Sequence, residues 1–167
     1  AGGFESVIHL SECRSSRERP GRLKTMKLLI PIDGSDYSLR AVEQVLRHVS
    51  PRNPPDIHLL HVCERIDAWE VRRFLTAEEI AQIQLKESMV ELQPCRDLLD
   101  AAAVPYHFQV LVGDGEVGKA ISHYAAQHDC DLIVMGKQGD NTLEDMLLGS
   151  VTRYALAQSQ CDVLVSV

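Results

Sequence analysis

The sequence predicts an α/β fold in which a parallel β-sheet carries helices on both faces. Five short apolar segments alternate with longer segments whose apolar residues recur at helical spacing. The first segment, residues 27–32, is an almost uninterrupted apolar run, which is typical of a strand buried on both faces of a parallel sheet. The chain has 167 residues, 45% of them hydrophobic, so one domain with a sizeable and mainly aliphatic core is expected.

Composition argues against several classes of protein. The net charge of −7 disfavours broad binding to nucleic acids or anionic membranes, and we expect neither nucleic-acid binding nor membrane insertion. No apolar run approaches the roughly 20 residues that a membrane-spanning helix needs. The five cysteines are scattered without a C-x-x-C pair, which favours reduced thiols that act as small buried hydrophobes in a cytoplasmic protein.

The histidines do not predict a metal site. His58 and His61 are three residues apart in a predicted strand, so their side chains should point to opposite faces of the sheet. His123 and His128 are five residues apart on a predicted helix, and this spacing also separates them. We therefore predict no metal ligands.

Residues 1–25 differ from the rest of the chain. They begin with Ala1, show no lasting periodicity and lack the apolar centre of a secretory signal. Arginine and serine would suit a transit peptide, but Glu5, Glu12 and Glu18 argue against one. We expect residues 1–25 to be a flexible leader, either added to the protein artificially or translated from upstream of the natural start at Met26. Residues 26–167 are expected to form a single domain.

The first predicted strand, residues 27–32, ends at Asp33, Gly34 and Ser35. Ser35 is expected to cap the following helix. Asp33 lies where open α/β sheets bind ligands, at the carboxyl end of a strand, so it either faces a ligand or, like Ser35, caps the next helix. The helix should cover residues 36–49, since apolar residues recur there at i, i+3, i+4 and i+7: Val42, Val45, Leu46 and Val49.

Residues 57–63 form the second predicted strand, and residues 64–75 follow as a loop in which Trp69 is expected to act as a packing anchor. Thr76 and Glu79 have the spacing of a capping box at the start of a long helix. Pro94 should kink or split that helix, because proline removes one hydrogen bond and clashes with the preceding turn.

The remaining elements complete the alternation. Residues 106–112, 132–135 and 163–167 are predicted strands, and helices are expected from Val117 and from Ser150. Strands that alternate with helices in this way form right-handed βαβ units.

A glycine motif follows the strand at residues 132–135. Gly136, Gly139, Gly149 and Ser150 have the spacing G-x2-G-x9-G-S, and a helix starts at the last pair. Glycine lets backbone amides approach a phosphate closely, and a helix N-terminus points free N–H groups at it. The motif therefore indicates an anion-binding loop.

A second glycine segment, GDGEVGK at residues 113–119, matches both G-x-G-x-x-G and G-x4-G-K. A phosphate-binding P-loop needs Ser or Thr after the lysine, where this chain has Ala120. A dinucleotide site would need an acidic residue about 20 positions on, where the chain is apolar. Asp114 and Glu116 would repel a phosphate, so we interpret Gly113 and Gly115 as a tight turn with Glu116 in the first turn of the next helix.

The chain from about Met26 to Val167 resembles the universal stress proteins, in the branch with an ATP-binding loop. Three features carry the resemblance: the glycine motif, the opening LLIPIDGS and the closing SQCDVLVSV. The resemblance implies a Rossmann-like open sheet of five parallel strands in the order 3-2-1-4-5. It also implies ATP, with Mg²⁺, as ligand. The residues that it assigns to nucleotide contact are Pro31, Ile32, Asp33, Val62, Met135, Gly136, Gly139, Gly149, Ser150, Val151 and Thr152.

Within that assignment, Asp33 and the Val62 main chain would contact the adenosine, and Met135 would give the base or sugar an apolar face. The glycine loop would approach the ribose and first phosphate, and the start of the last helix would bind the outer phosphates. The acidic residues of the spacer, Asp140, Glu144 and Asp145, depart from the family pattern. They face solvent, help to hold a cation, or weaken phosphate binding.

No nucleophile with a paired base is evident, so we expect no catalytic residues and at most slow ATP hydrolysis. The predicted function is a cytoplasmic ATP-binding stress sensor or regulator that acts through a partner protein. Val163, Val165 and Val167 form an apolar edge strand, which predicts a homodimer. The alternatives are an interaction module of the same fold without nucleotide and a slow ATPase.

Overall fold

One β-sheet organises the computed structural model, which describes residues 7–8, 25–50, 52–66, 68–113, 115–138 and 148–166. Its strand order is β1-β4-β3-β2-β5-β6. The five strands from β2 to β6 are parallel to one another, which confirms the predicted order 3-2-1-4-5. Their bounds are β2 (Lys27–Ile32), β3 (Asp56–Glu64), β4 (Tyr106–Gly113), β5 (Leu132–Gly136) and β6 (Asp162–Ser166).

The sheet also contains a short strand that the sequence did not predict. Strand β1 (Val7–Ile8) lies within the expected leader and pairs antiparallel with Val110 and Leu111 of β4. A strand of two residues is too short to show a periodic pattern in the sequence. Its place in the sheet is set by its pairing with β4.

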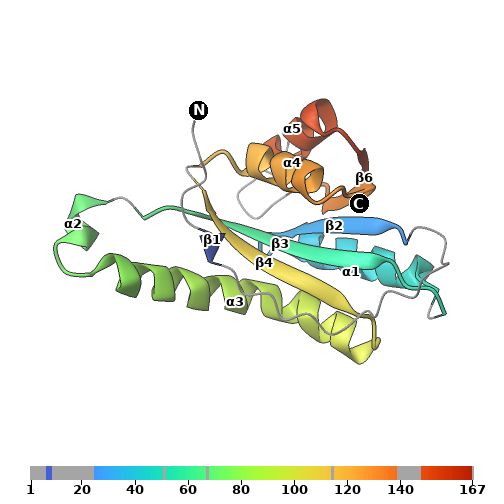
Figure 1. The fold of residues 1–167 in the computed structure, drawn as a ribbon, viewed down its shortest axis with the longest axis horizontal. Helices are drawn as coiled ribbons and strands as arrows, with labels where there is room; N and C mark the ends of the chain where they lie inside the picture. The colour runs from blue at the N-terminus through green and yellow to red at the C-terminus, as the bar shows by residue number, and fades with distance from the viewer. Residues whose placement is uncertain are drawn as a thin grey trace.

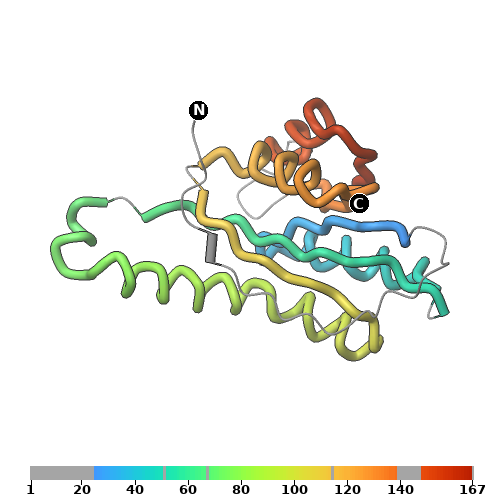
Figure 2. Tube along the Cα trace, viewed as in Figure 1, coloured from blue at the N-terminus to red at the C-terminus, as the bar shows by residue number. Residues whose placement is uncertain are grey.

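Helices cover both faces of the sheet, as Figure 1 and the trace in Figure 2 show. Helices α1 (Asp36–His48) and α3 (Ala77–Ala101) lie on one face, and α4 (Val117–Gln127) and α5 (Ser150–Gln158) lie on the other. A short helix, α2 (Trp69–Arg72), occupies the segment that was predicted as a loop. Trp69 is 63% exposed, so it is not the packing anchor that the sequence suggested.

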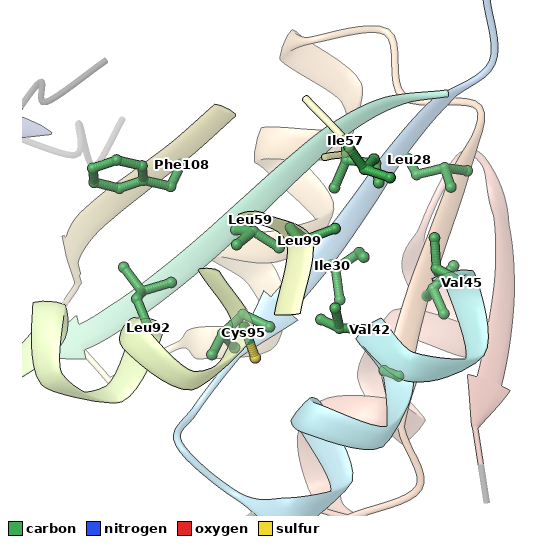
Figure 3. Close-up of a cluster of buried hydrophobic side chains, with 14 of the residues drawn as sticks. Leu28, Ile30, Val42, Val45, Ile57, Leu59, Leu92, Cys95, Leu99 and Phe108 are labelled. Carbon is green, nitrogen blue, oxygen red and sulfur yellow. The ribbon is translucent and has the colours of Figure 1, made fainter. Parts of the chain in front are cut away.

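Two hydrophobic clusters fill the space between these layers. The first lies between the sheet and helices α1 and α3, and its side chains include Ile30, Val42, Leu59 and Leu92 (Figure 3). The second lies under α4 and α5 and is built around Leu29. Successive residues of β2 enter different clusters, which explains why the sequence of this strand is an unbroken apolar run.

The two histidines of β3 point to opposite faces, as their spacing predicted. The His58 ring contacts the Tyr124 hydroxyl of α4, with 3.0 Å between Nδ1 and Oη. The His61 ring lies on the α3 side, where its Nδ1 is 2.9 Å from the carbonyl oxygen of Ile32.

The cysteines of the described chain are unpaired. Cys95 and Cys130 are buried, and burial raises the pKa of these thiols to about 12 and about 11. Both thiols therefore stay protonated near neutral pH, as expected of cysteines that act as small hydrophobes.

Helix α3 begins with the predicted capping box. The Glu79 backbone N–H donates to Thr76 Oγ1 at 3.2 Å, and the Thr76 N–H donates to Glu79 Oε2 at 2.7 Å. The backbone N–H of Thr76, and then its hydroxyl, lower the pKa of the Glu79 carboxyl.

Replacing Thr76 tests how far this cap holds the long helix in place. We expect Thr76→Ala to lower the free energy of unfolding by about 1 kcal/mol, because Ala cannot accept the N–H bond. Urea denaturation followed by circular dichroism measures the change. Thr76→Ser retains the hydroxyl and should stay within a few tenths of a kcal/mol of the parent; equal losses in both variants would contradict the capping argument.

Helix α3 runs without interruption through Pro94, so of the two predicted effects, a kink or a split, the split is wrong. Proline at position 94 deprives the Val90 carbonyl of its usual partner. Val90 is 68% exposed and Pro94 is exposed as well, so water can satisfy that carbonyl. Leu92, Cys95 and Leu99 anchor the helix in the first cluster on either side of the proline.

Among the helices of the described residues, none has both the length and the apolar character needed to cross a bilayer.

Candidate functional site

A cleft of about 740 Å³ opens at the carboxyl ends of β2, β3 and β5. The starts of α4 and α5 form its other wall. Strands β2 and β5 are neighbours in the sheet, and the chain connects onward from them in opposite directions, so this is the switch point of an open α/β sheet. The volume lies within the range of about 300–1,000 Å³ that small-molecule sites occupy.

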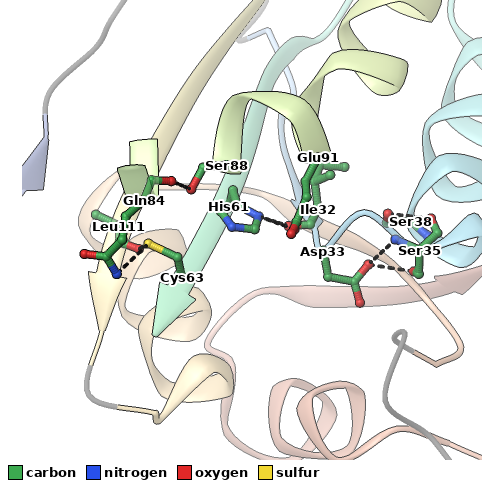
Figure 4. Close-up of polar contacts among 10 residues, drawn as sticks. All are labelled: Ile32, Asp33, Ser35, Ser38, His61, Cys63, Gln84, Ser88, Glu91 and Leu111. Carbon is green, nitrogen blue, oxygen red and sulfur yellow. Dashed lines mark hydrogen bonds and ion pairs between the residues drawn. The ribbon is translucent and has the colours of Figure 1, made fainter. Parts of the chain in front are cut away.

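The end of β2 brings a carboxylate to the cleft in a fixed position. Asp33 Oδ1 accepts two hydrogen bonds from Ser35, one from the backbone N–H at 3.1 Å and one from the hydroxyl at 2.6 Å. Ser35 Oγ in turn accepts the Ser38 N–H at 3.2 Å, which confirms Ser35 as the cap of α1. Figure 4 shows the second carboxylate oxygen of Asp33 pointing away from Ser35, where it is accessible to a ligand.

The turn after Asp33 depends on Gly34. Its φ of +78° lies in the left-handed region, where side chains other than glycine are strained. A Cβ atom there would also lie 3.1 Å from Glu91 Cγ. Gly34 therefore lets the chain turn directly from the strand into the cap of α1.

The end of β3 presents its main chain to the cleft. Strand β2 stops pairing at Ile32, opposite His61, whereas β3 continues to pair with β4 as far as Glu64 and Gly113. The backbone around Val62 therefore has β4 on one side and the cleft on the other. A main chain in this position can exchange hydrogen bonds with the edge of a planar base.

The end of β5 packs closely against the start of α1. A Cβ atom on Gly136 would lie 2.6 Å from Tyr37 Cβ and 2.9 Å from the Tyr37 carbonyl oxygen, so only glycine fits without movement. The Thr152 hydroxyl of α5 donates to the Gly136 carbonyl at 3.0 Å and is buried. Because this hydroxyl donates its single proton to Gly136, Thr152 would contact a phosphate through its backbone N–H.

Helix α5 starts at the cleft without a side-chain cap. Gly149 is its N-cap residue, and glycine has no side chain with which to accept the first N–H groups. The Gly149 N–H donates to the Lys137 carbonyl at 3.0 Å, which holds the loop end beside β5. The N-terminal amides at Ser150, Val151 and Thr152 and the positive end of the helix dipole therefore favour an anion here.

The structure brings the residues of the sequence prediction together. All ten of those that are described line this one cleft: Pro31, Ile32, Asp33, Val62, Met135, Gly136, Gly149, Ser150, Val151 and Thr152. Gly139 lies outside the described residues, as do Asp140, Glu144 and Asp145 of the acidic spacer.

The segment with the second glycine pattern also reaches the cleft, which the sequence analysis did not anticipate. Gly115, Glu116 and Gly118 are among the lining residues. Gly115 has a φ of +92°, in agreement with a turn, and a Cβ on Gly118 would lie 2.8 Å from Tyr154 Cβ. These glycines therefore serve a turn and the contact between α4 and α5. Glu116 precedes α4 as its N-cap residue and lies outside the first turn where we had expected it.

The cleft is acidic for a site that would hold phosphate. Its lining has the carboxylates of Asp33, Glu64, Glu91 and Glu116, and its lysine, Lys119, pairs with Glu116. A carboxylate about 6 Å from a phosphate charge opposes it by roughly 1–3 kcal/mol, depending on the local dielectric. A divalent cation bound with the phosphates would offset this repulsion.

Helix α3 contributes residues that sequence reasoning missed. Glu91 Oε2 lies 3.5 Å from His61 Nδ1, and both side chains line the cleft (Figure 4). Gln84 Nε2 donates to the Glu64 carbonyl at 2.6 Å and fixes the end of β3. Neither residue belongs to a sequence motif. Glu91 reaches the cleft because α3 packs against β2, β3 and β4, and only the spacing of the buried positions of α3 could have indicated this.

Comparisons with known proteins agree with this architecture. The sequence profile of the universal stress protein family matches residues 24–166. Universal stress protein MJ0531 of Methanocaldococcus jannaschii is 28% identical over 147 residues, which are 88% of this chain and 85% of that protein. Universal stress protein YxiE of Bacillus subtilis is 28% identical over 148 residues, which are 83% of this chain and 97% of that protein.

Solved structures share the fold. The structure of hypothetical protein MJ0577 is 25% identical, with a TM-score of 0.72 over 86% of this chain and 96% of its own. A universal stress protein in complex with cAMP has 22% identity and a TM-score of 0.62, and covers 85% of this chain and 97% of its own. A universal stress protein family protein from Arabidopsis thaliana with AMP bound has 17% identity and a TM-score of 0.57, and covers 84% of this chain and 90% of its own.

Proposed function

The chain belongs to the universal stress protein family, and we propose that it binds an adenine nucleotide in the cleft between β2 and β5. One observation carries the proposal. The residues that the glycine motif and the family resemblance assign to nucleotide contact come from distant parts of the chain, yet the ten that are described line one cleft. Family structures with cAMP and AMP bound support an adenine nucleotide as the ligand.

We propose the following arrangement of the ligand. The base lies against the Val62 main chain and the apolar side chain of Met135, and Asp33 accepts a hydrogen bond from the adenosine portion. The phosphates extend toward the uncapped start of α5 at Gly149 and Ser150. This direction places the negative charge at the positive end of the helix dipole and away from Glu91 on α3.

We propose ATP, bound with Mg²⁺, as the physiological nucleotide. The acidic lining opposes a bare triphosphate, so Mg²⁺ should strengthen ATP binding more than AMP binding. Calorimetric titration with AMP, ATP and GTP, each with and without Mg²⁺, tests this. We expect one adenine nucleotide per chain and GTP weaker by about tenfold or more, because the Val62 main chain would meet a different base edge. A parent protein that binds none of these nucleotides would favour the interaction module without nucleotide.

Asp33→Asn tests the adenosine contact. The amide oxygen of Asn can still accept from Ser35, so the turn is kept, while the carboxylate charge is lost. We expect adenine nucleotides to bind about tenfold more weakly, because a hydrogen bond to a charged acceptor contributes roughly 1.5–3 kcal/mol. Asp36→Asn, which removes an exposed carboxylate from the first turn of α1, is the matched control and should leave affinity unchanged. Equal affinities for both variants would contradict the role of Asp33.

We further propose that the chain forms a homodimer through β6 and acts in the cytoplasm as a stress-response regulator with a partner protein. Strand β6 ends the sheet order, and its Leu164 is 47% exposed. Val163 packs in part against the second cluster, so the contact would rely on the strand backbone and Leu164 as well as on Val165. Val167 lies outside the described residues. The unpaired cysteines of the described chain suit a reducing compartment.

A further inference from the structure

A second cluster of polar side chains lies at the end of the sheet opposite to the cleft, where β3 and β4 begin. Asp56 and His58 are two residues apart on β3 and therefore share a face. His107 on β4 is the direct register partner of His58, and their ring centroids are 5.1 Å apart. One possible ligand atom from each of the three residues lies within 4.8 Å of the others.

We propose that Asp56, His58 and His107 bind a divalent transition-metal ion of the zinc class. Two imidazole nitrogens and one carboxylate oxygen form a ligand set that suits Zn²⁺, Co²⁺ or Ni²⁺, with water in the remaining positions. The sequence alone does not indicate this site, because His58 and His107 belong to different strands and meet only through the register of β3 and β4.

Both histidines turn the same nitrogen toward the carboxylate. His58 Nε2 is 3.5 Å from Asp56 Oδ2, and His107 Nε2 is 3.4 Å from Asp56 Oδ1. These separations are long for hydrogen bonds. A metal ion between the three atoms would replace two weak contacts with three coordinate bonds of about 2.0–2.2 Å after small side-chain movements.

Tyr124 supplies the supporting contact that metal-binding histidines commonly have. His58 Nδ1 lies 3.0 Å from Tyr124 Oη, and the Tyr124 ring stacks on His128 with 4.0 Å between centroids. When Nδ1 donates its proton to that hydroxyl, Nε2 presents a lone pair toward Asp56. Such an outer hydrogen bond fixes both the tautomer and the orientation of the ring for metal binding.

Charge and access also suit a cation. The side chains of Asp56 and His107 are 31% and 30% exposed, so an ion can enter from solvent, whereas His58 is 11% exposed and held in place. The carboxylate of Asp56 brings negative charge to the cluster. Lys27 opposes a cation, but its ammonium group is bound to the His128 carbonyl at 2.6 Å.

Titration of the nucleotide-free protein with Co²⁺, followed by visible absorption, tests the site directly. We expect saturation at one ion per chain, no thiolate-to-cobalt charge-transfer band, and displacement of Co²⁺ by Zn²⁺. His107→Gln should weaken binding by about tenfold or more, because it removes one of three ligands, as should Asp56→Asn. His107 is partly exposed, so its replacement should leave the circular dichroism spectrum unchanged.

His48→Ala is the matched control, since His48 is an exposed histidine whose Nδ1 lies 2.8 Å from the Gln44 carbonyl oxygen of its own helix. It should bind Co²⁺ as tightly as the parent. Equal affinities of the parent, His48→Ala and His107→Gln would overturn the proposal, because the ion would then bind adventitiously elsewhere. A thiolate band in the parent would overturn it as well, because the ligands would then be cysteines. Neither outcome depends on nucleotide binding in the cleft.

Discussion

Gly149→Asp is expected to weaken nucleotide binding by about a hundredfold or more while the fold remains at least as stable as that of the parent. Gly149 is the N-cap of α5, with φ −63° and ψ 155°, which any residue can adopt. Aspartate is among the preferred N-cap residues, and its carboxylate would accept the N–H groups that the phosphates are proposed to use. The substitution therefore adds a helix cap and removes an anion site in one step.

The loss of affinity should be large because two effects combine. The capping carboxylate occupies the free amides of α5, and its charge repels the phosphate. At about 6 Å and an effective dielectric constant near 20, this repulsion is roughly 3 kcal/mol, or about a hundredfold in affinity. Calorimetry with ATP and Mg²⁺ measures the loss, and urea denaturation should give a free energy of unfolding equal to that of the parent or a few tenths of a kcal/mol higher.

Gly149→Asn separates the two effects. Asparagine caps a helix about as well as aspartate but carries no charge, so its affinity should fall between those of the parent and Gly149→Asp. If both variants bind ATP as tightly as the parent, the phosphates do not lie at the start of α5. The proposal for the adenosine portion would then rest on Asp33, Val62 and Met135 alone.

Much of the fold follows from local pattern, because the relevant physics is local. The unbroken apolar run of β2 reflects burial on both faces, and the Thr76–Glu79 capping box needs only four residues to form. The cleft could be predicted because the carboxyl ends of neighbouring parallel strands must meet. Once β2 and β5 were recognised as strands and the family resemblance had placed them side by side, Asp33 and Gly136 had to lie at the same edge of the sheet.

Contacts between distant elements could not be predicted in this way. Glu91 reaches the cleft only because α3 packs against β2, β3 and β4, and His107 meets His58 only because of the register between β3 and β4. Pro94 was expected to kink or split α3, since its local effect is unfavourable, but the helix is not split, because Val90 is exposed and residues on either side of the proline are anchored in the first cluster. Each of these outcomes depends on how elements that are distant in the sequence pack or pair with one another.

Gly136→Ala is expected to destabilise the protein strongly, because the added methyl group meets backbone atoms. The new Cβ would lie 2.6 Å from Tyr37 Cβ, 2.8 Å from the Tyr37 carbonyl carbon and 2.9 Å from its oxygen. These atoms belong to the first turn of α1, so relief requires movement of the helix itself. Overpacking of this kind typically lowers the free energy of unfolding by 1–3 kcal/mol, and we expect about 3 kcal/mol here.

Gly113→Ala provides the matched comparison, because Gly113 also ends a strand beside the cleft. A Cβ there would have as its nearest neighbour Val62 Cγ1 at 3.5 Å, an ordinary van der Waals contact. Its free energy of unfolding should stay within about 1 kcal/mol of the parent. By thermal denaturation, Gly136→Ala should melt roughly 6–12 °C lower than the parent, given about 2–4 °C per kcal/mol for a chain of this size.

Gly136→Ala should also weaken nucleotide binding, since movement of α1 displaces Ser35 and Ser38, and Ser35 holds the Asp33 carboxylate. Stability and affinity should therefore fall together in this variant, whereas Gly149→Asp should lose affinity alone. If Gly136→Ala and Gly113→Ala melt at the same temperature, α1 can shift freely at its start. The close approach between Tyr37 and the end of β5 would then not be what positions Asp33.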